Sequence, residues 1–124
     1  MISRRNIRVK VMQSLYTLST LEHGAKQGEP LKLLQKHFEQ SKELLLYLTY
    51  FLAEVVSYSE KDSFQRRGKH LPSAADMNVN TKISGNEIIW KIREEESYQT
   101  EVGKAKPEQR LDKDLVRKIY LQLV

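Results

Sequence analysis

One long apolar strip constrains the fold of this chain more than any other feature. Between residues 31 and 58, apolar side chains recur at alternating spacings of four and three residues, a pattern typical of a helix that packs lengthwise on other helices. The strip consists of Leu34, Phe38, Ser41, Leu45, Leu48, Leu52 and Val55, flanked by Leu31, Leu44, Tyr47, Phe51 and Tyr58. The pattern predicts a helix that starts at Glu29–Pro30, extends toward Arg67 and is buried over more than half of its circumference. At 1.5 Å per residue such a helix spans about 50 Å, so part of its apolar surface is expected to pack on something beyond this chain.

The longest apolar run, residues 44–56, does not read as a membrane span. It contains Glu54 and two tyrosines, whereas a span needs roughly 20 consecutive apolar residues. The sequence therefore predicts a buried helix here and no membrane partner.

Three further helices are expected around the long one. The first starts at the N-cap Ser3 and ends near Glu22–Gly24. After a loop at residues 68–78, another starts at Asn80 or Thr81, and residues 93–102 continue it as a weaker helix. A polar linker at residues 103–111 leads to a last helix capped by Asp112. The expected core positions are Ile7, Val11, Leu15 and Leu18, then Ile83, Ile88, Ile89, Trp90 and Ile92, then Leu115, Ile119 and Leu123.

No segment alternates in the manner of a strand, so the expected fold class is all-α. The prediction is a helical bundle of about four main helices with one long central helix, in a single domain over residues 1–124. The last apolar pattern runs up to Val124 without a glycine or proline stop. This favours the N-terminal part of a longer protein over a helix that frays at a natural terminus. It also predicts an exposed apolar patch on the long or the last helix, which a homodimer mate is one way of covering.

The composition argues against several function classes. The chain has no cysteine, which excludes disulfides and cysteine metal sites and fits a reducing cytoplasm. No secretory signal precedes the first helix. His23, His37 and His70 lie far apart, and no phosphate-binding glycine loop or nucleophile elbow occurs. The adjacent acids at residues 94–96 do not converge on one helix face. We therefore expect no enzyme, no cofactor and no metal.

The positive charge is concentrated at one end of the chain. The net charge is +5, and residues 1–21 hold four basic and no acidic residues: Arg4, Arg5, Arg8 and Lys10. Positive charge at a helix N-terminus opposes the helix dipole, so a sequence that accepts it there indicates an external anion. The four residues are the candidate RNA-binding site, because guanidinium groups suit phosphates and base edges. Leu15 and Tyr16 are expected to be buried anchors of the same helix.

The opening segment SRRNIRVKVMQSLYTL resembles the start of the NusB family of transcription antitermination factors. The resemblance rests on Arg4, Arg5 and Arg8, followed by Gln13, Leu15 and Tyr16. The segment MNVNTKISGNEIIWKI fits the longer NusB-like proteins of the Bacteroidetes type. The match is specific over residues 3–18, and the family's later motifs do not occur in these 124 residues.

The resemblance implies an all-helical protein that binds boxA-type single-stranded RNA through its arginine-rich start. It also implies assembly with the ribosomal protein NusE in the transcription antitermination complex. Two alternatives stay open: a NusB-like domain attached to an RNA cytosine methyltransferase, and a helical scaffold that binds protein and not RNA.

A second basic cluster follows the long helix at Arg66, Arg67, Lys69 and His70. It either extends an RNA track or forms a solvated helix end that the dipole favours; the second interpretation is preferred. Tyr47, Tyr50 and Tyr58 lie at helical spacing inside an apolar run, so they are expected in the core and not stacked on bases.

Overall fold

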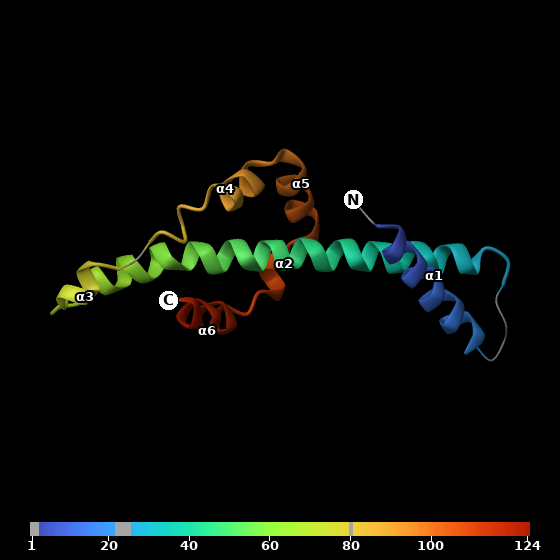
Figure 1. The fold of residues 1–124 in the computed structure, drawn as a ribbon, viewed down its shortest axis with the longest axis horizontal. Coiled ribbons are helices and arrows are strands. Elements are labelled where there is room, and N and C mark those ends of the chain that lie inside the picture. Colours follow the sequence, from blue (N-terminus) through green and yellow to red (C-terminus); the bar gives the residue numbers. More distant parts are fainter. Residues whose placement is uncertain (1–2, 22–25, 80) are drawn as a thin grey trace. The chain divides into compact units, whose positions relative to one another are not determined.

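The structure is a computed structural model that describes residues 3–21, 26–79 and 81–124. Within these ranges the chain forms helices and no strand (Figure 1). The elements are α1 (Arg4–Ser19), α2 (Glu29–Arg67), α3 (Ala74–Met77), α4 (Glu87–Glu94), α5 (Glu96–Ala105), a 3-10 helix η1 (Pro107–Arg110) and α6 (Lys113–Leu123). The predicted all-α class with one long central helix is confirmed.

The chain forms two compact units, Met1–Leu45 and Leu46–Val124, and α2 contributes to both. The first unit contains α1 and the first part of α2, and the second contains the remaining elements. The expectation of a single domain stays a prediction, because compactness of a unit does not show that it folds independently.

The ends of α1 and α2 follow from local capping. The Ser3 hydroxyl accepts a hydrogen bond from the Asn6 N–H at 3.2 Å, which confirms Ser3 as the N-cap of α1. That helix ends at Ser19, and the hydroxyls of Thr17, Ser19 and Thr20 donate to backbone carbonyls three or four residues earlier. The expected end at Glu22–Gly24 lies outside the described residues. The predicted bounds of α2 are confirmed at Glu29 and at Arg67.

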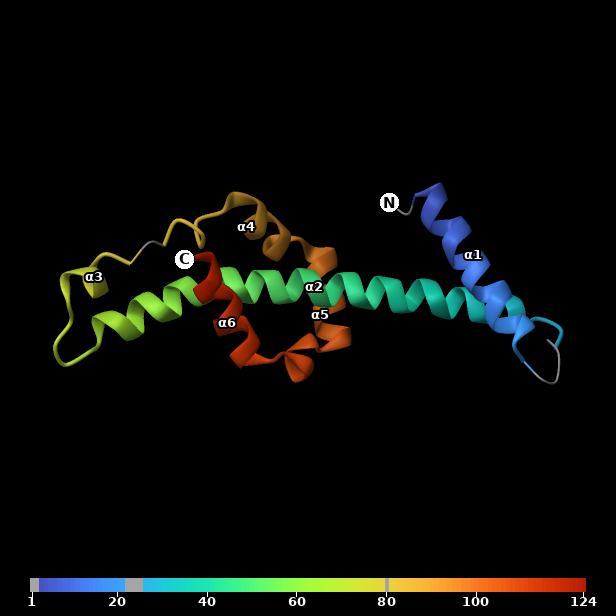
Figure 2. The ribbon, with the colours of Figure 1, turned by 60° about the horizontal axis from the view of Figure 1, so that its bottom comes forward.

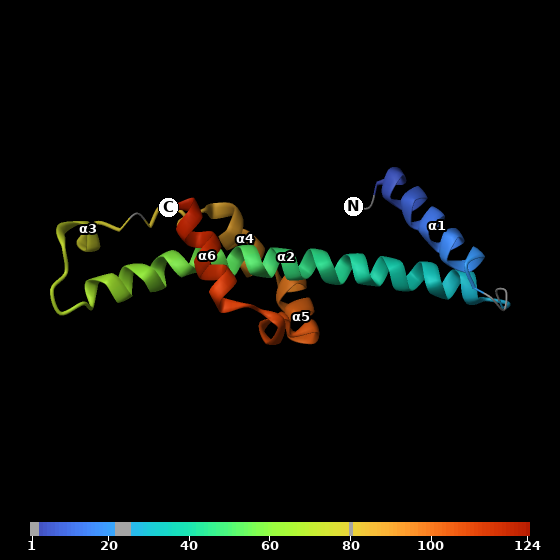
Figure 3. The same ribbon diagram turned by 90° about the horizontal axis from the view of Figure 1, so that it is seen from below.

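In the first unit, α1 lies at an oblique angle to the beginning of α2 in all three ribbon views (Figures 1, 2 and 3). The contact is made where the buried Ser14 faces His37, and Ser14 Oγ lies 3.0 Å from His37 Nδ1. The same Ser14 hydroxyl donates to the Lys10 carbonyl at 2.8 Å. Its single proton is then committed to that carbonyl, so His37 Nδ1 must be the donor in the bond to Ser14. A small residue at the crossing lets the two helices approach closely.

The core of the second unit lies on two sides of α2. Ala53 and Val56 pack with Ile89 of α4 and Ile83, and Val55 packs with Val116 and Tyr120 of α6. Figure 1 shows α4 and α6 on either side of this part of α2, and Figures 2 and 3 keep α6 beside it. Residues 53 and 55 point about 200° apart on a helix wheel, which explains how one helix serves both clusters.

The long apolar strip of α2 is buried at its C-terminal end only. Val55 is buried, but Leu45, Leu48 and Leu52 are exposed. The prediction that α2 is buried over more than half of its circumference is therefore wrong for the middle of the helix. The predicted exposed apolar surface on the long or the last helix is confirmed at Leu48 and Leu52 and at Leu121 and Leu123.

The last helix packs in a register different from the predicted one. Asp112 caps α6 as expected, because its carboxylate accepts hydrogen bonds from Asp114 and Leu115 N–H. The buried positions are Val116 and Tyr120, however, while Leu115 and Leu123 are exposed and Ile119 is partly buried. The buried face is rotated by about one residue because Tyr120, which is also amphipathic, fills the space beside Tyr58 with ring centroids 5.1 Å apart.

The region between α2 and α6 contains more helix than predicted. The expected loop 68–78 contains α3, and a capping box formed by Ser73 and Asp76 caps the N-terminus of this helix. The third predicted helix starts later, because Asn86 accepts hydrogen bonds from two following N–H groups. Of the predicted caps, Asn80 lies outside the described residues and Thr81 precedes a turn that contains Gly85. Glu95 has extended backbone and separates α4 from α5, which continues through Gly103.

Candidate nucleic-acid interface

The N-terminal half of α1 presents three arginines to solvent. Arg4, Arg5 and Arg8 are all exposed, and the first turn of α1 contains no acidic residue. Among the described residues, none of the three forms an ion pair. Each guanidinium therefore keeps its five donors available for an anion.

Lys10, the fourth predicted residue, lies on a different side of α1. It is half-buried and lines a groove where α1 crosses α2. The groove has a volume of about 470 Å³, and Asn6 of α1 and Phe38 of α2 are among the residues that line it. The structure thus brings Arg4, Arg5 and Arg8 to one exposed region of α1 and places Lys10 on another side of the helix, in the groove against α2.

The predicted burial of Leu15 and Tyr16 is wrong. Leu15 is 55% exposed and Tyr16 is 72% exposed. The side of α1 that meets α2 carries Ser14 and the half-buried Leu18 instead. Because only a short stretch of α1 touches α2, Val11 and Leu18 are half-buried there while Leu15 and Tyr16 remain largely exposed.

Two exposed side chains further along α1 lie on the same side of the helix as the arginines. On a helix wheel Tyr16 lies about 20° from Arg5 and Met12 about 20° on the other side. Met12 is also exposed. The arginines therefore continue along α1 into an exposed surface that includes an aromatic ring, which the sequence pattern had assigned to the core.

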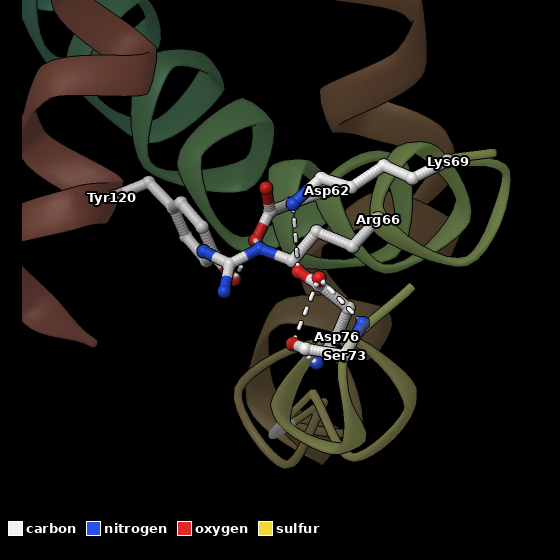
Figure 4. A network of polar contacts seen from close by, with 6 residues as sticks. All are labelled: Asp62, Arg66, Lys69, Ser73, Asp76 and Tyr120. Atoms are coloured by element: carbon white, nitrogen blue, oxygen red, sulfur yellow. Dashed lines mark hydrogen bonds and ion pairs between the residues drawn. The ribbon is translucent and has the colours of Figure 1, made fainter. Parts of the chain in front are cut away.

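The second basic cluster is largely neutralised by acidic neighbours (Figure 4). Arg66 Nε lies 2.8 Å from Asp62 Oδ2, and this pairing raises the pKa of the guanidinium. Lys69 Nζ lies 2.8 Å from Asp76 Oδ1. The hydrogen bond from Lys69, and then those from Ser73, lower the pKa of Asp76 from 3.8 to about 2. Arg66 and Lys69 are thus paired inside the fold, which supports a structured helix end over an RNA track.

Among the described residues, the histidines and tyrosines do not converge on one site. His37 bonds to Ser14, His70 is exposed and His23 lies outside the described residues. Over residues 3–21, 26–79 and 81–124, no group of three or more His, Cys, Asp or Glu side chains is placed to hold a metal ion. Tyr47, Tyr50 and Tyr58 are half-buried, and burial raises the pKa of Tyr50. Tyr58 contacts Tyr120, and Tyr47 contacts Phe51, so these rings contribute to packing.

None of the helices in the described ranges combines the length and apolar character required to cross a bilayer. Comparison of the chain with protein-family models, curated proteins and solved structures gives no match. The exposed cationic end of α1 is therefore the feature from which a function can be argued.

Proposed function

We propose that this chain binds single-stranded RNA through the N-terminal half of α1. The observation that carries the proposal is the exposure of Arg4, Arg5 and Arg8 on a helix start without an acidic residue. Positive charge there is unfavourable to the isolated helix by some tenths of a kcal/mol per charge. A bound polyanion removes that penalty and accepts the forked hydrogen bonds of the guanidinium groups.

The resemblance of residues 3–18 to the NusB family extends this proposal to a biological role. In that role the chain is a transcription antitermination factor, it recognises a boxA-like RNA and it assembles with NusE. It acts by holding RNA and protein together and carries out no catalysis.

Salt dependence of RNA binding tests the proposal. If Arg4, Arg5, Arg8 and Lys10 each contact a phosphate, log K should fall against log salt with a slope near −2.8, from about −0.7 per contact on single strands. Binding should then weaken roughly fifty-fold between 50 and 200 mM salt. The measurement is fluorescence anisotropy with a labelled boxA-like RNA.

Single-residue variants show which residues contribute to the slope of log K against log salt. Each Arg→Ala change in α1 should reduce the magnitude of the slope by about 0.7 and leave the helix content unchanged by circular dichroism. Arg117→Ala is the matched control, because Arg117 is an exposed arginine on another helix, α6. Arg8→Lys should keep the slope, and it should relax sequence preference if the guanidinium reads a base. An unchanged slope after all four residues are made alanine would refute the proposal.

A helical scaffold for a protein partner is the second candidate function. It is favoured by the exposed apolar side chains of α1 and α6, among them Met12, Leu121 and Leu123. The same titration separates the two, since a scaffold that binds only protein has no salt-dependent affinity for RNA.

A further inference from the structure

A cleft in the second unit combines opposite charges with serine and threonine hydroxyls. Its volume of about 370 Å³ lies at the lower end of the roughly 300–1,000 Å³ typical of small-molecule sites. One wall is the C-terminal part of α2, and the other is the turn that precedes α4. The residues that line the cleft are Glu60, Ser63, Phe64, Arg67, Thr81 and Ser84.

The α2 wall carries a carboxylate and a guanidinium on one face of the helix. Glu60 and Arg67 are seven residues apart, which places them about two turns, or about 10.5 Å, apart along the same side of α2. Both side chains are exposed, and neither forms an ion pair within residues 3–21, 26–79 and 81–124. Both charges are therefore available to a ligand. Because they are opposite, a simple anion or a simple cation would meet a like charge in the cleft.

A buried hydroxyl lies on α2 between these two charges. Ser63 is 7% exposed and lines the cleft. Other buried or half-buried serines of this helix donate to a carbonyl of the preceding turn, as Ser57 and Ser59 do, whereas the Ser63 hydroxyl makes no hydrogen bond in the described part of the chain. Every fully enclosed polar side-chain atom there has a partner. The Ser63 oxygen therefore opens into the cleft, where it can bond to a ligand.

The turn before α4 adds a hydroxyl that can only accept. Ser84 is 8% exposed, and its hydroxyl donates to the Thr81 carbonyl at 2.7 Å. Its single proton is thereby committed, so Ser84 Oγ is left with acceptor capacity alone. The Trp90 indole N–H donates to the Ser84 carbonyl at 2.6 Å, which fixes this turn against α4. The cleft thus offers acceptors to a positively charged donor as well as a guanidinium to an anion.

We infer that this cleft binds a free α-amino acid with an apolar side chain. Glu60 and Ser84 Oγ accept hydrogen bonds from its ammonium group. Arg67 and the Ser63 hydroxyl donate to its carboxylate, since the guanidinium fork matches a carboxylate. The exposed ring of Phe64 provides an apolar contact for its side chain. A zwitterion satisfies both charges at once, and the small volume suits a molecule of this size. The site is separate from α1 and does not depend on the proposed RNA binding.

Two-dimensional nuclear magnetic resonance of the full chain, titrated with L-leucine, tests the inference. The amide signals of Ser63 and Ser84 should shift as L-leucine is added. N-acetyl-L-leucine keeps the carboxylate and lacks the ammonium group, whereas L-leucinamide keeps the ammonium group and lacks the carboxylate. Each should bind about tenfold more weakly than L-leucine, because each loses one hydrogen-bonded charge pair.

Two charge-removing variants identify which residue holds which group. Glu60→Gln should weaken binding of L-leucine about tenfold and leave that of N-acetyl-L-leucine unchanged. Arg67→Ala should weaken binding of L-leucine to the same extent and leave that of L-leucinamide unchanged. Both residues are exposed, so circular dichroism should show unchanged helix content.

Glu94→Gln and Arg117→Ala are the matched controls, because both residues are exposed, lie on other helices and do not line the cleft. They should bind L-leucine as wild type does. Absence of shifts at the two serine amides, equal binding of the three probes, or wild-type affinity for L-leucine in both charge-removing variants overturns the inference.

Discussion

Tyr120 is a fully buried aromatic residue with a polar function. Its side chain is 0% exposed, packs in the cluster with Val55 and Val116, and its hydroxyl donates to Asp62 Oδ2 at 3.3 Å. Burial, then the charge of Asp62, raises the pKa of this phenol. The same carboxylate accepts from Arg66 (Figure 4), so Asp62 keeps a partner if the phenol is removed.

Two substitutions at this position separate packing from hydrogen bonding. Tyr120→Phe should lower the free energy of unfolding by about 1 kcal/mol, the usual contribution of one hydrogen bond. Tyr120→Ala should lower it by about 3–5 kcal/mol through the cavity it leaves. Tyr16→Ala, at an exposed tyrosine, should stay within about 0.5 kcal/mol. Urea denaturation followed by circular dichroism measures all three, and equal effects of the two alanine variants would contradict the assigned burial of Tyr120.

Asp76 provides a pH-dependent contact at the start of α3. Its pKa is lowered from 3.8 to about 2 by the Lys69 hydrogen bond and by those from the Ser73 backbone and hydroxyl. A carboxyl whose pKa is lower in the folded state stabilises that state while it is ionised. The contribution of this capping box should therefore be complete above pH 3.8 and be lost as the pH falls through about 2.

Nuclear magnetic resonance of the Asp76 carboxyl carbon measures this directly. The titration midpoint should lie near 2 in wild type and rise toward 3.8 in Lys69→Ala, because the variant removes the largest cause of the shift. A wild-type midpoint at the ordinary value would show that the Lys69–Asp76 pair does not persist in solution.

At the scale of elements, the oblique contact between α1 and α2 buries only a short part of α1. Ser14 and His37 define the contact, and the half-buried Leu18 lies next to it. A second depression of about 280 Å³ lies between α1 and the start of α2, and Leu15 and Leu31 line it. The packing around α1 is therefore open on both sides of the crossing.

The Leu15→Ala variant tests how loosely α1 is packed. Because Leu15 is 55% exposed, its truncation should lower the free energy of unfolding by less than about 1 kcal/mol, compared with about 2–5 kcal/mol for a buried leucine. Leu18→Ala, the matched variant on the same helix, should cost more because Leu18 is half-buried. Denaturation in urea measures both. If Leu15→Ala lowered the free energy of unfolding as much as truncation of a buried leucine does, Leu15 would be a core residue, as the periodicity predicted.

At the scale of the whole molecule, charge and apolar surface are both unevenly distributed. The net charge of +5 comes mostly from the first 21 residues. Large apolar side chains are exposed in each unit, including Met12 and Tyr16 in the first and Leu48, Leu52 and Leu121 in the second. Such surfaces are uncommon on monomeric proteins when they are contiguous. Under the proposed function, these surfaces are where the proposed protein partner, NusE or a second copy of the chain, would bind.

The sequence by itself determined the helices whose signals are local. Ser3 and Asp112 were identified as N-caps from residue type alone, and the bounds of α2 from its apolar period and Pro30. Capping and helix period involve neighbours within four residues, so they can be predicted without knowing the fold. The exposed cations Arg4, Arg5 and Arg8 were also predictable, because no acid lies near them in sequence.

The tertiary structure alone decided which faces of those helices are buried. The apolar stripe of α1 extends over more of its surface than α2 covers, and the crossing at Ser14 selects a side that leaves Leu15 and Tyr16 exposed. In α6 the choice between Leu115 and Val116 depends on Tyr120 meeting Tyr58 from another element. The groove at Phe38 and Lys10 likewise requires two helices to meet. Hydrophobic burial is not directional, so the pattern shows that a helix is amphipathic, but the partner determines which residues leave water.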